Sequence, residues 1–201
     1  MGSKDEVLVR KIKGVLQNSF LAFLAIAIAW VFAVRISNTG WINLRSYSIL
    51  GAPFFEEALK GLLVFLLAPT VYLLYLSRAK HKPSLTALAL LAGVLVGLLF
   101  GLVESTSQKE SIEDLLTGIL THSIWTAAVG VGTCSFWRDG SKRLPIGTYL
   151  VAVFGHMAWN YQVYFPSPLT TSIAAVFLTA AVPVSLLGYS VHASRKKRRP
   201  L

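Results

Sequence analysis

The feature that most constrains this chain is a succession of apolar runs, each close to the ~20 residues that an α-helix needs to cross a bilayer. About six such runs are present, at residues 15–35, 48–77, 84–105, 112–136, 144–164 and 167–192. Only 14% of the residues are charged, against roughly 25% in soluble domains. The sequence therefore predicts an all-α, polytopic membrane helix bundle in which residues 1–201 form a single transmembrane domain.

The basic residues alternate between the segments that join these runs. The N-terminal segment, the second and fourth loops and the C-terminal tail hold 15 Lys and Arg residues, and the other loops hold 3. The positive-inside rule places the basic segments in the cytoplasm, so we expect a multi-pass protein of the cell membrane with both termini cytoplasmic. This distribution accounts for the net charge of +10 without a nucleic-acid partner. The first run is longer than a signal-peptide core of 7–15 residues, and we interpret it as a retained helix.

Six ionisable residues lie inside the apolar runs, although a charged side chain at the centre of a membrane helix costs roughly 2.5–3.5 kcal/mol. In the predicted orientation all six fall in the outer half of the bilayer, on four different helices, and a polar amide follows the last of them. The set consists of Glu56, Glu57, Lys60, Glu104, His122, His156 and Asn160. A shared depth on four helices indicates one polar site in the extracytoplasmic half.

Helical spacing groups some of these side chains. Lys60 follows Glu56 by four residues and Glu57 by three, so that it shares a helix face with both. The two glutamates point about 100° apart, and one can line a cavity while the other reaches a neighbouring helix. Pro53 just before the pair predicts that the helix begins there, because proline is tolerated in a first turn. We expect residues 45–50 to form an interfacial lead-in.

A row of glycines precedes Glu104 on its helix. Gly97 and Gly101 form a G-x-x-x-G pair, and Gly93 extends the row by another four residues. Small residues at this spacing let the backbones of membrane helices approach closely. We therefore expect a neighbouring helix to pack against this row and bring Glu104 near its partners.

Four motifs stand in a recognisable order along the chain. They are E-E-x-x-K at residues 56–60, G-x-x-F-G-x-x-E at residues 97–104, a histidine at residue 122, and H-x-x-W-N at residues 156–160. With these motifs the chain resembles the PrsW family of intramembrane proteases, which are relatives of the CAAX-processing prenyl endopeptidases. Glu104 stands where the CAAX relatives have a histidine, which argues against a prenylated substrate. The resemblance implies hydrolysis of membrane-anchored proteins, such as anti-sigma factors, in a polar cavity.

The available side chains suit hydrolysis by an activated water. No serine or cysteine is convincingly paired with a base, and Cys134 lies away from the polar set. We expect Glu56 or Glu57 to act as general base, with Glu56 slightly favoured from the resemblance, and Lys60 to hold one of the two ionised.

The remaining polar residues receive supporting roles. His122 would orient the water or protonate the leaving amine, and Glu104 would orient an imidazole or Lys60. His156 and Asn160 would donate hydrogen bonds to the developing oxyanion. We interpret the tryptophans at residues 125, 137 and 159 as packing or interfacial residues.

Three alternatives stay open. Glu104, His122 and His156 are also plausible zinc ligands, with one glutamate of the pair as base; the favoured mechanism needs no cofactor. A non-catalytic scaffold similar to APH-1 subunits, or a proton-coupled transporter, would also carry intramembrane acids and histidines. The sequence leaves the substrate and the oligomeric state open.

Overall fold

The computed structural model describes residues 47–76, 84–108 and 112–197, together with residues 6, 7, 9, 10, 12 and 14. In these ranges no strand is present, which confirms the predicted all-α class. A π-helical turn, η1 (Tyr47–Gly51), leads into the helices α3 (Ala52–Leu76), α4 (Leu85–Gln108), α5 (Ile112–Asp139), α6 (Arg143–Tyr164) and α7 (Pro168–Lys197). The predicted span at residues 15–35 lies outside the described residues.

Three of the described helices are long and apolar enough to cross a membrane. The qualifying stretches are Leu85–Glu104 in α4, Leu115–Arg138 in α5 and Pro168–Ser190 in α7. Helix α3, which holds Glu56, Glu57 and Lys60, and helix α6 are not among them. The structure thus supports a membrane protein, while the count of six spans stays a prediction.

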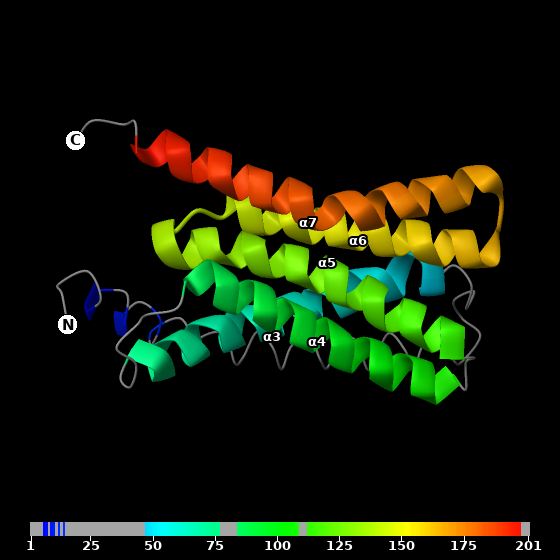
Figure 1. Ribbon diagram of the computed structural model, residues 1–201, viewed down its shortest axis with the longest axis horizontal. Coiled ribbons are helices and arrows are strands. Elements are labelled where there is room, and N and C mark those ends of the chain that lie inside the picture. Colours follow the sequence, from blue (N-terminus) through cyan, green and yellow to red (C-terminus); the bar gives the residue numbers. More distant parts are fainter. Residues whose placement is uncertain are drawn as a thin grey trace.

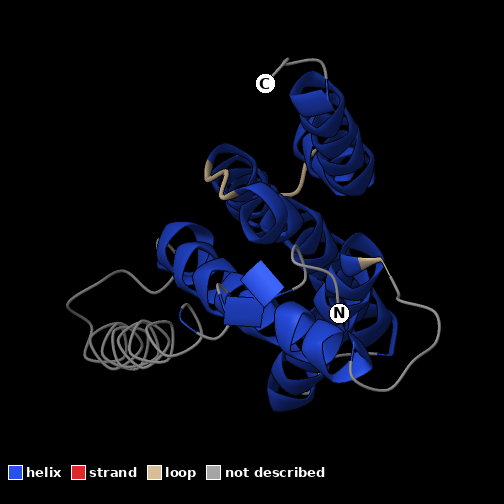
Figure 2. Cartoon of the chain, turned by 90° about the vertical axis from the view of Figure 1, so that its left-hand side faces the viewer, coloured by secondary structure: helices blue, strands red, loops and turns tan. Residues whose placement is uncertain are grey.

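Successive helices run antiparallel, and α5 lies at the centre of the bundle (Figure 1). Helix α5 contacts α3, α4, α6 and α7. Figure 2, turned by 90°, shows helices throughout most of the coloured part of the chain. Because the direction alternates, the start of α3, the end of α4, the start of α5 and the end of α6 meet at one end of the bundle. Most of the predicted polar site lies there.

The glycine row of α4 packs against the backbone of α5, as the sequence predicts. A Cβ built on Gly93 would lie 2.5 Å from the Thr126 carbonyl oxygen, and one on Gly101 would lie 2.6 Å from the Ile119 Cα. A Cβ on Gly97 would collide with the His122 carbonyl oxygen. These obstacles are backbone atoms that cannot rotate away. The close approach of α4 and α5 therefore depends on residues without a side chain.

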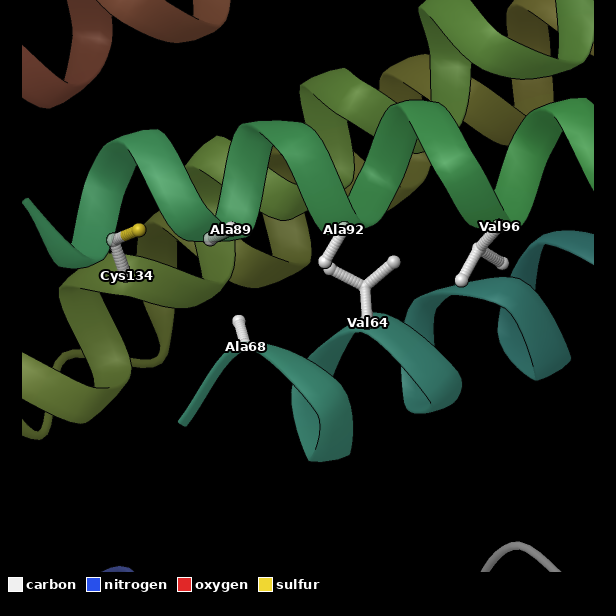
Figure 3. Packing of buried hydrophobic residues seen from close by; sticks show 6 residues of the cluster. All are labelled: Val64, Ala68, Ala89, Ala92, Val96 and Cys134. Atoms are coloured by element: carbon white, nitrogen blue, oxygen red, sulfur yellow. The ribbon is translucent and has the colours of Figure 1, made fainter. Parts of the chain in front are cut away.

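A core of small apolar residues joins α3, α4 and α5 (Figure 3). Val64 of α3 points toward Ala92 of α4, and Ala68 lies farther along α3. Cys134 of α5 is buried at the edge of this cluster. Small side chains permit close packing of three helices, and the thiol occupies space in that packing, as the sequence predicts.

Large apolar side chains are exposed along the outer faces of α4 and α7. Those of α4 are Leu91, Leu95, Leu98, Leu99, Leu102 and Val103, and those of α7 include Leu169, Ile173, Val176, Val184 and Leu187. Contiguous apolar surface of this kind is rare on monomeric soluble proteins. It matches the lipid-facing surface that a membrane helix presents.

The lead-in to α3 is a single π-helical turn. Helix α3 begins at Ala52, so Pro53 lies in its first turn, as the sequence predicts. Residues Tyr47–Gly51 form the η1 turn directly before it. π-Helical turns are rare, and many of those that occur lie near functional sites. Here the turn leads directly to the Glu56–Glu57 pair.

Candidate active site

A cavity of about 480 Å³ opens between η1, α3, α4, α5 and α6. Its walls consist of Ser48, Ala52, Glu56, Glu104, Thr117, Gly118, Thr121, His122, Trp125, His156, Trp159, Asn160, Val163 and Tyr164. Five of the seven residues in the predicted set therefore line one cavity. The other two, Glu57 and Lys60, are fully buried and contact members of this lining.

The two adjacent glutamates have different surroundings. Glu56 lines the cavity, and its side chain is 14% exposed. Its Oε2 atom has no hydrogen-bond partner in the described part of the chain and lies 3.9 Å from the Lys60 Nζ atom. The Glu57 side chain has no exposed surface and points into the protein. The predicted division, one glutamate toward a cavity and one toward a neighbouring helix, is what the structure has.

Lys60 is the centre of a buried polar network. Its Nζ atom donates a hydrogen bond to Glu57 Oε1 at 2.6 Å and contacts Nδ1 of His122 at 2.7 Å. It also lies 5.4 Å from the centroid of the Phe100 ring. The ammonium thus joins α3 to α5 and compensates part of the negative charge of the two glutamates.

His122 is held from two sides. Its Nε2 atom contacts Glu104 Oε2 at 2.7 Å, while Nδ1 faces Lys60. The imidazole is buried, whereas the Glu104 side chain is 37% exposed. A carboxylate at one ring nitrogen fixes the orientation of an imidazole. The predicted role of Glu104 in orienting an imidazole is consistent with this geometry.

His156 is oriented by a carboxylate and by an indole. Its Nδ1 atom contacts Glu57 Oε1 at 3.0 Å. Trp125 stacks on the imidazole, with the ring centroids 5.1 Å apart and an angle of 23° between the planes. Gly155 makes room for this indole, because a Cβ there would lie 2.8 Å from the Trp125 Nε1 atom. The ring of His156 is therefore fixed by Glu57 at its edge and by Trp125 on its face.

Helix α6 also anchors the segment that carries the glutamates. Asn160 Nδ2 donates a hydrogen bond to the Ser48 carbonyl oxygen at 2.7 Å, and the Tyr149 hydroxyl donates one to the Phe54 carbonyl oxygen at 3.0 Å. Both bonds end on backbone atoms of η1 or the first turn of α3. Together they fix the start of α3 relative to His156.

Glu56, His122 and His156 could hold a metal ion. One ligand atom from each of these residues lies within 4.8 Å of the other two. Two imidazoles and a carboxylate are a donor set that zinc uses in peptidases, and Glu56 Oε2 lacks a hydrogen-bond partner within the described ranges. By residue type alone, the three side chains are therefore possible ligands of a divalent cation. The grouping differs from the zinc set expected from the sequence, because Glu56 takes the place of Glu104.

Comparison with known protein families identifies the family of this chain. The model of the PrsW family intramembrane metalloproteases matches residues 12–187. The chain belongs to this family. As a PrsW-family member it is a membrane-embedded intramembrane protease, as the motifs predict. The word metalloprotease in the family description agrees with the Glu56–His122–His156 group, and the prediction of a glutamic mechanism without metal is not confirmed. No curated protein and no solved structure matches the chain.

Sequence reasoning about this PrsW-family chain overlooked the contribution of Trp125 to the site. We expected a packing residue, and the indole is indeed completely buried. It also lines the cavity and stacks on His156. Its position three residues after His122, on the same face of the helix, was the available signal. The small residue next to His156, Gly155, was a second one.

Proposed function

We propose that the chain is an intramembrane endopeptidase that hydrolyses peptide bonds of membrane-anchored proteins in the cavity lined by Glu56, His122 and His156. The observation that carries this proposal is that Glu56, unlike the adjacent Glu57, lines the cavity together with His122 and His156. Anti-sigma-factor-like proteins are the substrate class that the sequence resemblance implies. The cavity would lie in the extracytoplasmic half of a six-helix, single-domain bundle with both termini in the cytoplasm.

In the proposed mechanism Glu56 acts as the general base. Its carboxylate takes a proton from a water molecule, and the oxygen of that water attacks the scissile carbonyl carbon. The tetrahedral intermediate collapses when the carbon–nitrogen bond breaks, and the proton held by Glu56 passes to the leaving amine. A positioned acid–base group typically accelerates such a reaction ~10²–10⁴-fold.

The other polar residues would stabilise the oxyanion or position the side chains of the site. Asn160 uses one N–H in its bond to the Ser48 carbonyl oxygen, and its second N–H is available to the oxyanion. His156 faces Glu57 through Nδ1, so its Nε2 atom can donate to the oxyanion only in the protonated imidazole. Glu57 and Lys60 form a buried ion pair beneath the cavity, and Glu104 positions His122.

A metal ion held by Glu56, His122 and His156 would supply Lewis-acid polarisation of the carbonyl group and an activated water. In that case Glu56 would serve as a ligand, and its replacement would remove bound metal together with activity. Bound metal is therefore measured in each variant together with its activity.

The test compares the N-termini of membrane proteins in cells that produce the native chain, Glu56→Gln or Glu113→Gln at matched amounts. Glu113 is an exposed glutamate in the first turn of α5 and serves as the control. We expect new N-termini with the native chain and with Glu113→Gln, and a loss of at least ~100-fold with Glu56→Gln. The same N-termini in all three samples would refute the proposal and favour a non-catalytic scaffold.

Glu57→Gln separates the two glutamates. Because Glu57 is buried between Lys60 and His156, its replacement leaves the Lys60 ammonium poorly compensated. Breaking a buried ion pair costs about 3–5 kcal/mol. We therefore expect Glu57→Gln to lower the amount and the melting temperature of the protein, whereas Glu56→Gln lowers activity at an unchanged melting temperature. The reverse pattern would assign the base to Glu57.

A further inference from the structure

The hydrogen bonds of His122 restrict what else its ring can bind. Lys60 Nζ lies 2.7 Å from Nδ1, and an ammonium can only donate hydrogen bonds. Nδ1 must therefore present its lone pair to Lys60. Because a neutral imidazole has one N–H and one lone pair, the proton lies on Nε2, where it is donated to Glu104 Oε2 at 2.7 Å.

In this arrangement His122 has no lone pair left for a metal ion. A metal at Nδ1 would take the place of the Lys60 ammonium. A metal at Nε2 would move the ring proton to Nδ1, where it would face the N–H groups of Lys60. Both positions require the ammonium to leave the ring. His156 differs, because its Nδ1 atom faces a carboxylate and its Nε2 atom keeps a lone pair.

We infer that Lys60 is an internal cation that keeps metal ions off His122, so that the Glu56–His122–His156 group binds a metal only when the Lys60 ammonium leaves the imidazole. The position of the lysine agrees with this. Its Nζ atom lies 2.7 Å from His122 Nδ1 and 3.9 Å from Glu56 Oε2, so it contacts two of the three possible ligands.

Charge supports the same conclusion. Lys60 is completely buried, and it contacts Glu57 at 2.6 Å and Glu56 at 3.9 Å. A divalent cation bound to Glu56 and His122 would lie close to this ammonium in a site of low dielectric, where like charges repel strongly. Removal of the ammonium charge should therefore favour metal binding. It leaves all three possible ligands in place.

This inference deepens the proposed function, because it concerns whether the peptidase site works with or without a metal. It is tested without substrate, so its failure can be told apart from failure of the proposed peptidase activity. The full-length chain, purified in detergent and treated with chelator, is titrated with Zn²⁺ against a competing chelator. Bound zinc per chain is measured directly, and Co²⁺ reports the ligands by its visible absorption.

The decisive variant is Lys60→Met, which keeps the length of the side chain without its charge. We expect it to bind Zn²⁺ at least ~10-fold more tightly than the native chain, an effect of the size seen for groups that neighbour metal ligands. Addition of His122→Ala to Lys60→Met should abolish the gain. A gain that survives His122→Ala would place the metal elsewhere and overturn the inference.

Lys60→Met leaves Glu57 without its ion-pair partner and could therefore misfold. A second variant tests the inference without that unpaired charge. In Lys60→Met/Glu57→Gln both buried charges are neutral, and Glu57→Gln alone is its reference. Thermal unfolding shows which variants are folded. Equal zinc affinity in Lys60→Met/Glu57→Gln and Glu57→Gln would overturn the inference, as would one tightly bound zinc per native chain at the affinity of Lys60→Met.

Discussion

Gly97 of α4 and His122 of α5 meet backbone to backbone, and a Cβ on Gly97 would collide with the carbonyl oxygen of His122. The same two helices carry Glu104 and His122, whose side chains contact each other at 2.7 Å. The distance between these helices therefore sets the geometry of the Glu104–His122 pair. A residue without a catalytic group thus controls the position of a site histidine.

Gly97→Ala should accordingly lower both stability and activity. The added methyl meets backbone, and overpacking of this kind costs about 1–3 kcal/mol. We expect a lower melting temperature in detergent and at least ~10-fold less cleavage. Gly147→Ala on α6 is the control, because a Cβ there meets nothing within 4 Å. Equal behaviour of the two variants would contradict the role of the glycine row.

Replacement of Glu104 should reduce activity in graded steps. In Glu104→Gln the amide oxygen can still accept the hydrogen bond from His122, but that bond loses its charge, whereas Glu104→Ala removes the bond. Hydrogen bonds to charged groups contribute ~1.5–3 kcal/mol and neutral ones ~0.5–1.5 kcal/mol. We expect kcat to fall about 10-fold for Glu104→Gln and about 100-fold for Glu104→Ala. Because the Glu104 side chain is partly exposed, water can replace its hydrogen bond in the folded protein, and the melting temperature should change little; a large decrease would indicate a mainly structural role.

Trp125 and Trp137 offer a matched pair of buried indoles. Trp125 stacks on His156, and Trp137 donates its N–H to the Phe65 carbonyl oxygen away from the cavity lining. Both Phe variants should be less stable, since deletions from a packed core leave voids. Only Trp125→Phe should also lower kcat in protein that remains folded, because it alters the support of His156. Equal kcat for the two folded variants would show that the reaction does not depend on the indole at residue 125.

The two bonds from α6 to the start of α3 should differ in their effect on catalysis. Tyr149→Phe removes a bond outside the cavity lining, at a cost of about 0.5–1.5 kcal/mol in stability, and should leave kcat nearly unchanged. Asn160→Leu removes a similar bond and also the proposed oxyanion donor, which is worth ~10²–10³ in kcat. The kcat ratio of the two variants measures the chemical contribution of Asn160. A ratio near one would remove Asn160 from the proposed mechanism.

Single cysteines test the predicted orientation. The chain has one native cysteine, Cys134, which is buried and should give little background. Lys142→Cys lies between α5 and α6, and Pro166→Cys lies between α6 and α7; both positions are exposed. With both termini in the cytoplasm, an impermeant maleimide should label residue 166 in intact cells and residue 142 only after lysis. The opposite labelling would reverse the orientation.

Parts of the fold and of the site follow from local sequence patterns. The glycine spacing in α4 predicts its contact with α5, and Pro53 predicts the start of α3, because both effects act within one or two turns. The adjacent positions of Glu56 and Glu57 predict that the two side chains diverge, and they do.

The pairing between helices could not be predicted in this way. Which carboxylate contacts which imidazole depends on the rotation and relative height of four helices, and no local pattern records these quantities. The contact of Lys60 with His122, 62 residues away, and that of His156 with Glu57 are of this kind. The same reason explains why Glu56 rather than Glu104 groups with the two histidines.

Tyr149 and Asn160 hold the start of α3 through hydrogen bonds that they donate to the carbonyl oxygens of residues 54 and 48. Main-chain acceptors persist whatever side chain the residue carries. The side chain of Ser48, which lines the cavity, could therefore change without loss of this bond to the segment that leads to Glu56. The chemistry of that part of the wall is thus separable from the position of the carboxylate.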